Sequence, residues 1–102
     1  TMDIVSLIYA HLPGNIRKPL HSNCIKWLKP GGKIILEAFN PLQLQNQSGG
    51  PRDISMLYTV EMLEEDFKCM RIDKLEYANI RLQEGLFHEG VADVIRMVAT
   101  KK

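Results

Sequence analysis

Two apolar runs within the first forty residues constrain the fold of this 102-residue chain more than any other feature. They cover residues 3–10 and 33–39, and the first is rich in β-branched side chains. Neither run alternates strictly between apolar and polar residues. Continuous apolar runs of this length are typical of strands that are covered on both faces. We therefore predict two buried parallel strands, with the first run as a central strand.

The segment between these runs has the spacing of an amphipathic helix. Pro13 and Gly14 break the first strand, and Asn15 is predicted to cap a helix that begins at Ile16. Arg17 is assigned to the solvated side. The helix ends where Lys29-Pro30-Gly31-Gly32 begins, because proline and glycine do not continue it. The predicted apolar stripe consists of Ile16, Leu20, Cys24, Ile25, Trp27 and Leu28.

Strand, helix and strand in this order form a βαβ unit, for which a right-handed crossover is expected. Ligands of such units bind beyond the carboxyl ends of the strands. The loops expected to carry a site are therefore residues 9–15 and 40–53.

The second half of the chain predicts a short helix followed by a hairpin. Thr59 is a candidate N-cap for a helix that ends near Phe67. From Lys68 the pattern has a period of two, over a stretch too long for a strand without a bend or bulge. Residues 91–100 form the last strand, paired antiparallel with the one before it. The fold class is thus α/β, with a mixed sheet.

Composition excludes several classes of protein. The formal net charge of +1 gives no bulk attraction to nucleic acid or anionic membranes. The longest apolar stretch is far shorter than the ~20 residues of a membrane span. The two cysteines form no CxxC pair, and no signal peptide is recognised. We expect a cytoplasmic protein without nucleic-acid or membrane partners.

Several motifs carry a family resemblance. Leu28-Lys29-Pro30-Gly31-Gly32-Lys33-Ile34-Ile35-Leu36 resembles the junction before the fifth strand of class I S-adenosylmethionine-dependent methyltransferases. Three further motifs resemble a small bacterial subgroup related to the tellurite-resistance and thiopurine enzymes. They are Ala10-His11-Leu12-Pro13, Gly49-Gly50-Pro51 and Glu84-Gly85-Leu86-Phe87-His88-Glu89-Gly90.

This resemblance runs from end to end and implies the C-terminal half of a Rossmann-like domain. Residues 1–102 would supply its fourth to seventh strands, in the spatial order first, second, fourth, third. The glycine-rich turn and acidic strand end that the family uses to bind S-adenosylmethionine have no counterpart here. We therefore interpret the chain as a partial domain that lacks the cofactor-binding half, is inactive alone and binds the cofactor weakly or not at all.

Two histidines are candidates for catalysis, because an imidazole near its ordinary pKa can act as a base. His11 follows the first strand on the ligand side, and binding to nearby backbone is an equally open role for it. His88 lies in a glycine-flanked loop, where the alternative is a structural turn. The resemblance places Tyr9, Ala10 and His11 near the cofactor. Packing against the sheet is an equally open role for Tyr9 and Phe39. The predicted acceptor-binding residues are Phe39, Asn40, Gly49, Gly50, Glu84, Phe87 and His88.

The remaining candidates have simpler interpretations. His21 is expected at the surface, Cys24 in the core and Trp27 against the sheet. Glu37, inside a buried strand, needs a partner, and we leave open whether it faces a pocket or binds nearby backbone. A metal site is not expected, since Glu84, His88 and Glu89 have no second histidine or cysteine cluster beside them.

Two functions remain open from the sequence. The first is the acceptor-side half of a methyltransferase acting on a small molecule, associated with its missing N-terminal half. The second is a noncatalytic binding or assembly module derived from that fold. In either case the exposed first strand predicts a homo-oligomer.

Overall fold

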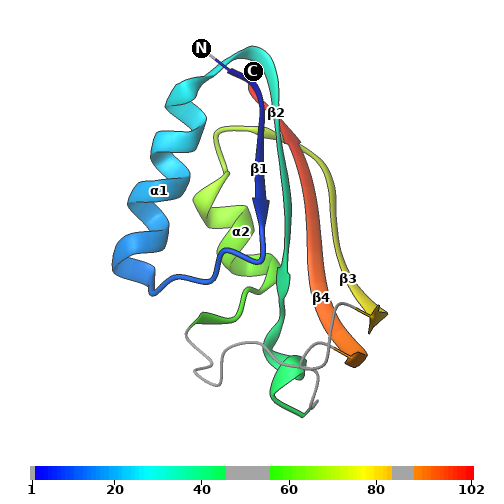
Figure 1. Ribbon diagram of the computed structural model, residues 1–102. Helices are drawn as coiled ribbons and strands as arrows, with labels where there is room; N and C mark the ends of the chain where they lie inside the picture. The colour runs from blue at the N-terminus through cyan, green and yellow to red at the C-terminus, as the bar shows by residue number, and fades with distance from the viewer. Residues whose placement is uncertain (1, 46–55, 84–88) are drawn as a thin grey trace.

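A computed structural model describes residues 2–45, 56–83 and 89–102 of the chain. Its elements, coloured along the chain in Figure 1, follow the predicted order of strand, helix, strand, helix and hairpin. They are β1 (Met2–Ile8), α1 (Gly14–Trp27), β2 (Leu28–Phe39), the 3-10 helix η1 (Pro41–Gln45), α2 (Val60–Asp66), β3 (Arg71–Gln83) and β4 (Glu89–Thr100).

The four strands form one mixed sheet with the order β1-β2-β4-β3. β1 and β2 are parallel, whereas β4 is antiparallel to both β2 and β3. This confirms the predicted strand order and the terminal hairpin. The register of β3 shifts between Ile72 and Lys74, which is the irregularity that its length predicted.

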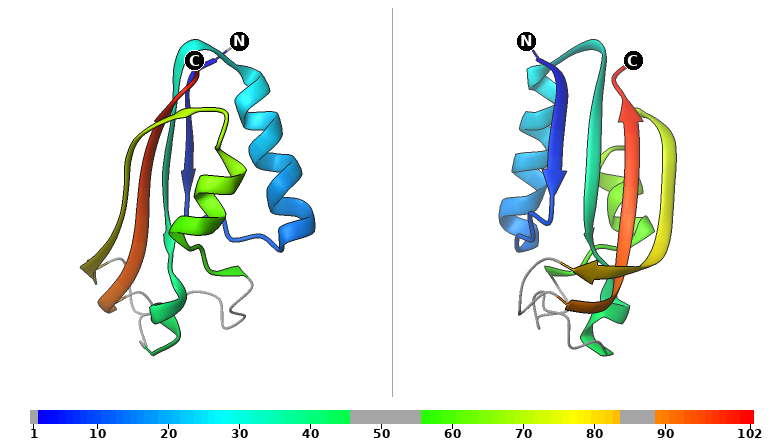
Figure 2. Two further views of the ribbon diagram at one scale, coloured as in Figure 1. Left: turned by 180° about the vertical axis from the view of Figure 1, so that it is seen from behind. Right: turned by 45° about the vertical axis from the view of Figure 1, so that its right-hand side comes forward.

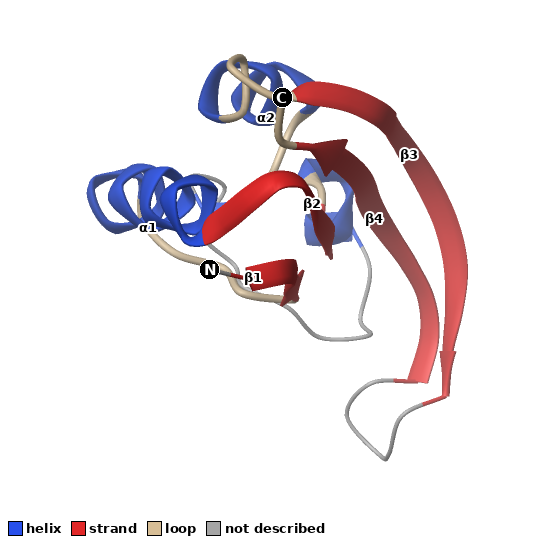
Figure 3. Cartoon of the chain, turned by 90° about the horizontal axis from the view of Figure 1, so that it is seen from above, coloured by secondary structure: helices blue, strands red, loops and turns tan. Residues whose placement is uncertain are grey.

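Both α-helices lie on the same face of the sheet (Figures 2 and 3). The side chains of Ile34, Leu36 and Ala38 on β2 point toward them and join the main core, as do Ile95 and Met97 on β4. Alternate residues point to the opposite face. At the carboxyl end of β2, Phe39 and Val94 on that face are buried against Leu57 and Leu44. No described helix covers the rest of it. We call this the open face.

β1 is an edge strand among the described residues, because it pairs only with β2. Ile4 and Ile8 are each 53% exposed on the open face, and Ile35 of β2 lies beside them with 38% exposure. Among the described residues the first apolar run thus lies at the edge, as the predicted strand order requires, and not in the central position that its apolar pattern indicated. The structure covers one of its faces with α1 and leaves the other without a helix.

Helix α1 differs from the prediction at both ends. It begins at Gly14 after Pro13, with no side-chain hydrogen bond at its cap, so Asn15 is not the N-cap. At its other end Lys29-Pro30-Gly31-Gly32 belongs to β2 rather than to a helix-terminating loop. Gly31 has φ +85°, and a Cβ on Gly32 would lie 2.9 Å from a Leu28 methyl and from the Lys29 carbonyl oxygen. The glycine pair is thus required for the strand to begin directly after the helix.

The buried face of α1 is also different from the predicted stripe. Arg17 and His21 are buried together with Cys24, while Ile16 and Trp27 are half exposed. The predicted core position of Cys24 is confirmed. The predictions that His21 lies at the surface and that Trp27 packs on the sheet are wrong. Arg17 and His21 can be buried because a carboxylate on α2 is the hydrogen-bond partner of both side chains.

That carboxylate is Asp66, whose side chain is almost completely buried. Its Oδ2 atom accepts a hydrogen bond from Arg17 Nε at 2.8 Å and lies 2.8 Å from His21 Nδ1. Burial and the neighbouring Arg17 charge lower the pKa of His21, while Asp66 opposes them. A neutral imidazole that donates from Nδ1 fits this environment. One buried ion pair thus joins α1 to α2.

We predict that Asp66→Ala destabilises the chain by about 3–5 kcal/mol, because it leaves Arg17 buried without its counter-charge. The matched control is Glu64→Ala, on the exposed side of the same helix, which should change the free energy of unfolding by less than ~0.5 kcal/mol. Urea denaturation followed by circular dichroism measures both. Equal midpoints for the two variants would contradict a stabilising role for the ion pair.

Candidate functional site

The candidate site lies at the carboxyl ends of β1 and β2, where the βαβ unit predicted it. Tyr9 follows β1 directly and has φ +55°, a left-handed conformation that is uncommon for a residue other than glycine. Its N–H donates to the Glu37 carbonyl oxygen at 2.6 Å. Backbone strain of this kind is retained where the surroundings fix it, and it is frequent at functional sites.

Three rings predicted to serve this site are stacked on one another. The ring centroids of Tyr9 and Phe39 are 4.9 Å apart, and those of His11 and Phe39 are 5.3 Å apart with nearly parallel planes. The Tyr58 ring approaches His11 at 5.6 Å in a tilted arrangement. The structure therefore brings the predicted residues Tyr9, His11 and Phe39 together, and we call them the aromatic stack.

His11 binds the backbone of both strand ends. Its Nε2 atom accepts the Phe39 N–H at 2.8 Å, so this nitrogen carries no proton. Burial lowers the pKa of His11, and a hydrogen bond with the Tyr9 backbone offsets part of that effect. A neutral ring with its proton on Nδ1 satisfies both bonds. Of the two roles left open by the sequence, this geometry favours binding to nearby backbone, since the lone pair that a base needs is occupied.

Tyr58 connects the aromatic stack to the helices, a role that the sequence analysis missed. Its hydroxyl donates to the Ala10 carbonyl oxygen at 2.6 Å, and its N–H donates to the Phe39 carbonyl oxygen at 2.9 Å. The ring meets His21 edge-on at 6.0 Å and lies 5.9 Å from the Arg17 guanidinium carbon. Burial raises the pKa of the Tyr58 hydroxyl, which keeps it protonated as a donor.

Glu37 finds side-chain partners at the same edge of the sheet. Its carboxylate accepts from the Tyr9 hydroxyl at 2.5 Å and from Arg96 Nε at 2.5 Å. The side chain is partly exposed on the open face. Both carboxylate oxygens hold neighbouring side chains, so Glu37 fixes the position of the Tyr9 ring.

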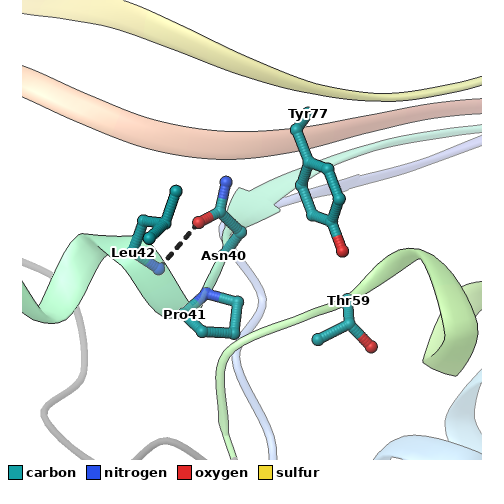
Figure 4. Close-up of a pocket in the computed structure, with 5 residues that line it drawn as sticks. All are labelled: Asn40, Pro41, Leu42, Thr59 and Tyr77. Atoms are coloured by element: carbon teal, nitrogen blue, oxygen red, sulfur yellow. Dashed lines mark hydrogen bonds between the residues drawn. The ribbon is translucent and has the colours of Figure 1, made fainter.

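Asn40 occupies the predicted edge, but its side chain is buried and serves the backbone. Its amide group donates to the Val94 carbonyl oxygen at 3.1 Å and accepts the Leu42 N–H at 2.8 Å. These bonds fix the start of η1. Five residues around it line a pocket of about 260 Å³ (Figure 4). They are Asn40, Pro41, Leu42, Thr59 and Tyr77.

Several predicted site residues lie outside the described residues. They are Gly49, Gly50, Glu84, Phe87 and His88. Within the described residues, no group of three or more His, Cys, Asp or Glu side chains is placed to hold a metal ion. The same residues include no helix long and apolar enough to cross a membrane.

No protein-family model matches the chain, but individual relatives do. It is 32% identical over 90 residues to a thiopurine S-methyltransferase of Legionella pneumophila (strain Paris) and 34% identical over 86 residues to that of strain Corby. Each alignment covers 81% of this chain and 37% of the relative. The chain thus spans little more than a third of the length of these curated relatives.

Several solved methyltransferase structures have the same fold as this chain, and it again covers only part of each of them. TehB from Haemophilus influenzae superposes with a TM-score of 0.71 at 15% identity, over 98% of this chain and 35% of TehB. A SAM-dependent methyltransferase from Methanosarcina mazei gives 0.72 at 14% identity, over 98% and 59% of the two chains. A SAM-dependent methyltransferase from Anabaena variabilis gives a TM-score of 0.69 at 14% identity, over 95% of this chain and 48% of the other. These similarities confirm the predicted Rossmann-like fold.

We predict that the chain loses stability as the pH falls below about 6.5. The folded state lowers the pKa of His11 and His21, whereas the unfolded chain takes up their protons near pH 6.5. Because the unfolded state binds more protons in this range, the free energy of unfolding decreases as the pH falls toward the folded-state pKa values.

His11→Gln tests this dependence, because a glutamine oxygen can accept the Phe39 N–H without titrating. Urea denaturation at pH 7.5 and pH 5.5 should show a smaller loss of stability in the variant than in the parent chain. The two losses of unfolding free energy should differ by at most about 1.4 kcal/mol per pH unit, since one proton is involved. Parallel pH profiles for parent and variant would rule out a neutral, backbone-bound His11.

Proposed function

We propose that this chain forms the acceptor side of a methyltransferase, since it corresponds to the C-terminal part of the class I S-adenosylmethionine-dependent fold. Within that fold it is similar to the group related to the thiopurine and TehB proteins. The acceptor is a small molecule. The observation that carries this proposal is the aromatic stack of Tyr9, His11 and Phe39 at the carboxyl ends of two parallel strands. The near balance of charge supports a small acceptor over a nucleic acid, and a cytoplasmic location remains a prediction.

The described residues fit S-adenosylmethionine only in part. Tyr9 and His11 offer ring faces at the strand ends, but the Ala10 carbonyl oxygen is occupied by Tyr58. Glu37, the carboxylate of the two parallel strands that lies nearest this edge, already binds Tyr9 and Arg96. When bound, the cofactor supplies the methyl group as a sulfonium, and this chain's part is to orient the acceptor beside it. Much of the rate gain in such a displacement comes from positioning.

Within this proposal, the residues of the aromatic stack orient the acceptor, and His88 removes its proton. His11 holds the two strand ends in register through its backbone bonds, so we assign the base to His88. Gly49, Gly50, Glu84 and Phe87 are proposed to complete the acceptor side.

We predict that the isolated chain binds S-adenosylmethionine more weakly than about 1 mM, which corresponds to about −4 kcal/mol. A partial set of contacts has to offset roughly 4 kcal/mol or more of lost translational and rotational freedom. Titration calorimetry and ligand-observed NMR measure the binding. Micromolar affinity would show that these residues contain a complete cofactor site and would refute the partial-site proposal.

A chimera tests the catalytic proposal directly. This chain replaces the matching C-terminal part of the Legionella pneumophila (strain Paris) thiopurine S-methyltransferase, and methyl transfer to a thiopurine is measured. We expect activity, and we expect His88→Ala to lower kcat and kcat/KM together by about 10²-fold while cofactor affinity stays unchanged. The control is Lys18→Ala, at an exposed position of α1. Unchanged turnover in His88→Ala would make His88 a turn residue and leave catalysis to positioning.

The edge strand supports a second candidate function, that of an assembly module. In the part of the chain that the structure describes, β1 pairs on one side only, and Met2, Ile4, Ile8 and Ile35 are exposed on or beside it. Unblocked edges of this kind pair with other strands. We propose that the isolated chain forms a homo-oligomer through β1, or pairs there with an N-terminal half.

Ile4→Lys should therefore shift the isolated chain from an oligomer toward a monomer, since a charge on the edge strand opposes pairing. Ile16→Lys is the matched control, because Ile16 is equally exposed at 51% but lies on α1. Sedimentation velocity across a concentration series measures both variants. A parent chain that stays monomeric, or equal effects of the two substitutions, would exclude association through β1.

A further inference from the structure

The pocket beside η1 is separate from the aromatic stack. Tyr77, which forms one of its walls, is in register with Ile95 and Ala38, and these two residues belong to the core under the helices. Phe39 is in register with Val94 and belongs to a second cluster. In Figure 4 the Tyr77 ring points toward Thr59, with Pro41 and Leu42 on the other side of the hollow. The pocket thus lies between η1, the start of α2 and β3.

The walls of this pocket are apolar and carry no charge. Leu42 and Tyr77 are 54% and 50% exposed, which is high for large apolar side chains that face a hollow. The amide of Asn40 is the most polar group of the lining, and both of its ends are bound to backbone. A charged ligand would lose hydration here without gaining a counter-charge, so the pocket favours uncharged molecules.

Two hydroxyl groups line the pocket. Thr59 Oγ1 accepts the Met62 N–H at 3.2 Å as the cap of α2, and the second hydroxyl belongs to Tyr77. The Tyr77 hydroxyl oxygen accepts the Val60 N–H at 3.0 Å. This bond orients the phenol but does not use its proton, and no acceptor for that proton is recorded among the described residues. The proton is available to a ligand atom that accepts a hydrogen bond, such as a ring nitrogen or a carbonyl oxygen.

The volume limits the size of the ligand. An apolar cavity of about 150 Å³ holds one benzene ring, and drug-sized ligands occupy about 300 Å³ or more. The pocket of about 260 Å³ therefore suits a molecule of one or two fused rings. A flat molecule also suits the walls, since the Tyr77 and Pro41 rings offer flat surfaces.

From these observations we propose that the pocket formed by Asn40, Pro41, Leu42, Thr59 and Tyr77 is a second small-molecule site. It binds an uncharged, flat compound of one or two rings that accepts a hydrogen bond from Tyr77. The site needs neither the cofactor nor the aromatic stack. Its occupation is therefore independent of the proposed methyl transfer.

Quinoline is a suitable probe, because it has two fused rings and one ring nitrogen and is uncharged at pH 7.5. Titration into the isotope-labelled chain should shift the methyl signals of Leu42 and Thr59 saturably, with a dissociation constant on the order of 1 mM or below. Quinoline-2-carboxylate adds a negative charge to the same rings, and we expect it to bind at least about tenfold more weakly. No saturable shift with quinoline, or shifts centred on Ile4, Ile8 and Ile35, would overturn the proposal.

Tyr77→Phe tests the hydrogen bond while keeping the apolar wall. We expect quinoline to bind about five- to tenfold more weakly to this variant, the usual effect of losing one hydrogen bond. Ile16→Ala, an exposed position on α1, should leave binding unchanged. A folded Tyr77→Phe variant with unaltered affinity would show that Tyr77 does not contact the ligand. Because the assay contains no S-adenosylmethionine, its result does not depend on the methyltransferase proposal.

Discussion

The buried carboxylate of Asp66 holds the helical layer together. It pairs with Arg17 and meets His21, both from α1, and thereby fixes the position of the two helices relative to each other. Removing a charge from water costs several kcal/mol, and the pair offsets this only while its geometry is kept. Tyr58 packs against Arg17 and His21, and its hydroxyl holds the Ala10 carbonyl. The ion pair therefore also influences the strand ends, through one tyrosine.

At the strand ends, the structure is arranged for rigidity more than for reactivity. The strained backbone of Tyr9 is held by its N–H bond to the Glu37 carbonyl and by the bond from its hydroxyl to the Glu37 carboxylate. The ring of His11 is held by the backbone of Phe39. Each of these groups has its hydrogen-bonding capacity used within the protein. A site of this kind contributes orientation, which is the main requirement of methyl transfer between a sulfonium and a nearby nucleophile.

Local patterns in the sequence predicted local structure well. The βαβ unit, the Thr59 cap and the irregular β3 follow from periodicity and from turn or cap residues, and the structure contains all three. The burial of Arg17 and His21 could not be read in this way, because their partner Asp66 lies 49 and 45 residues away. Tyr58 was missed for the same reason, since its hydroxyl binds Ala10 across 48 residues. Polar side chains are assigned to solvent by pattern alone, and only tertiary contacts reverse that assignment.

The open face of the sheet divides into two halves of different chemistry. On the β3 and β4 side, ion pairs such as Lys33–Asp73, Lys74–Glu76 and Arg96–Glu37 cover the surface and suit contact with water. On the β1 side, Ile4, Ile8 and Ile35 are exposed beside the edge of β1, which pairs with β2 alone among the described strands. Exposed apolar side chains that adjoin one another at an edge mark an interaction surface. A second copy of this chain and the further residues of the longer methyltransferases it resembles would both cover the β1 half, and the ion pairs would remain in solvent in either case.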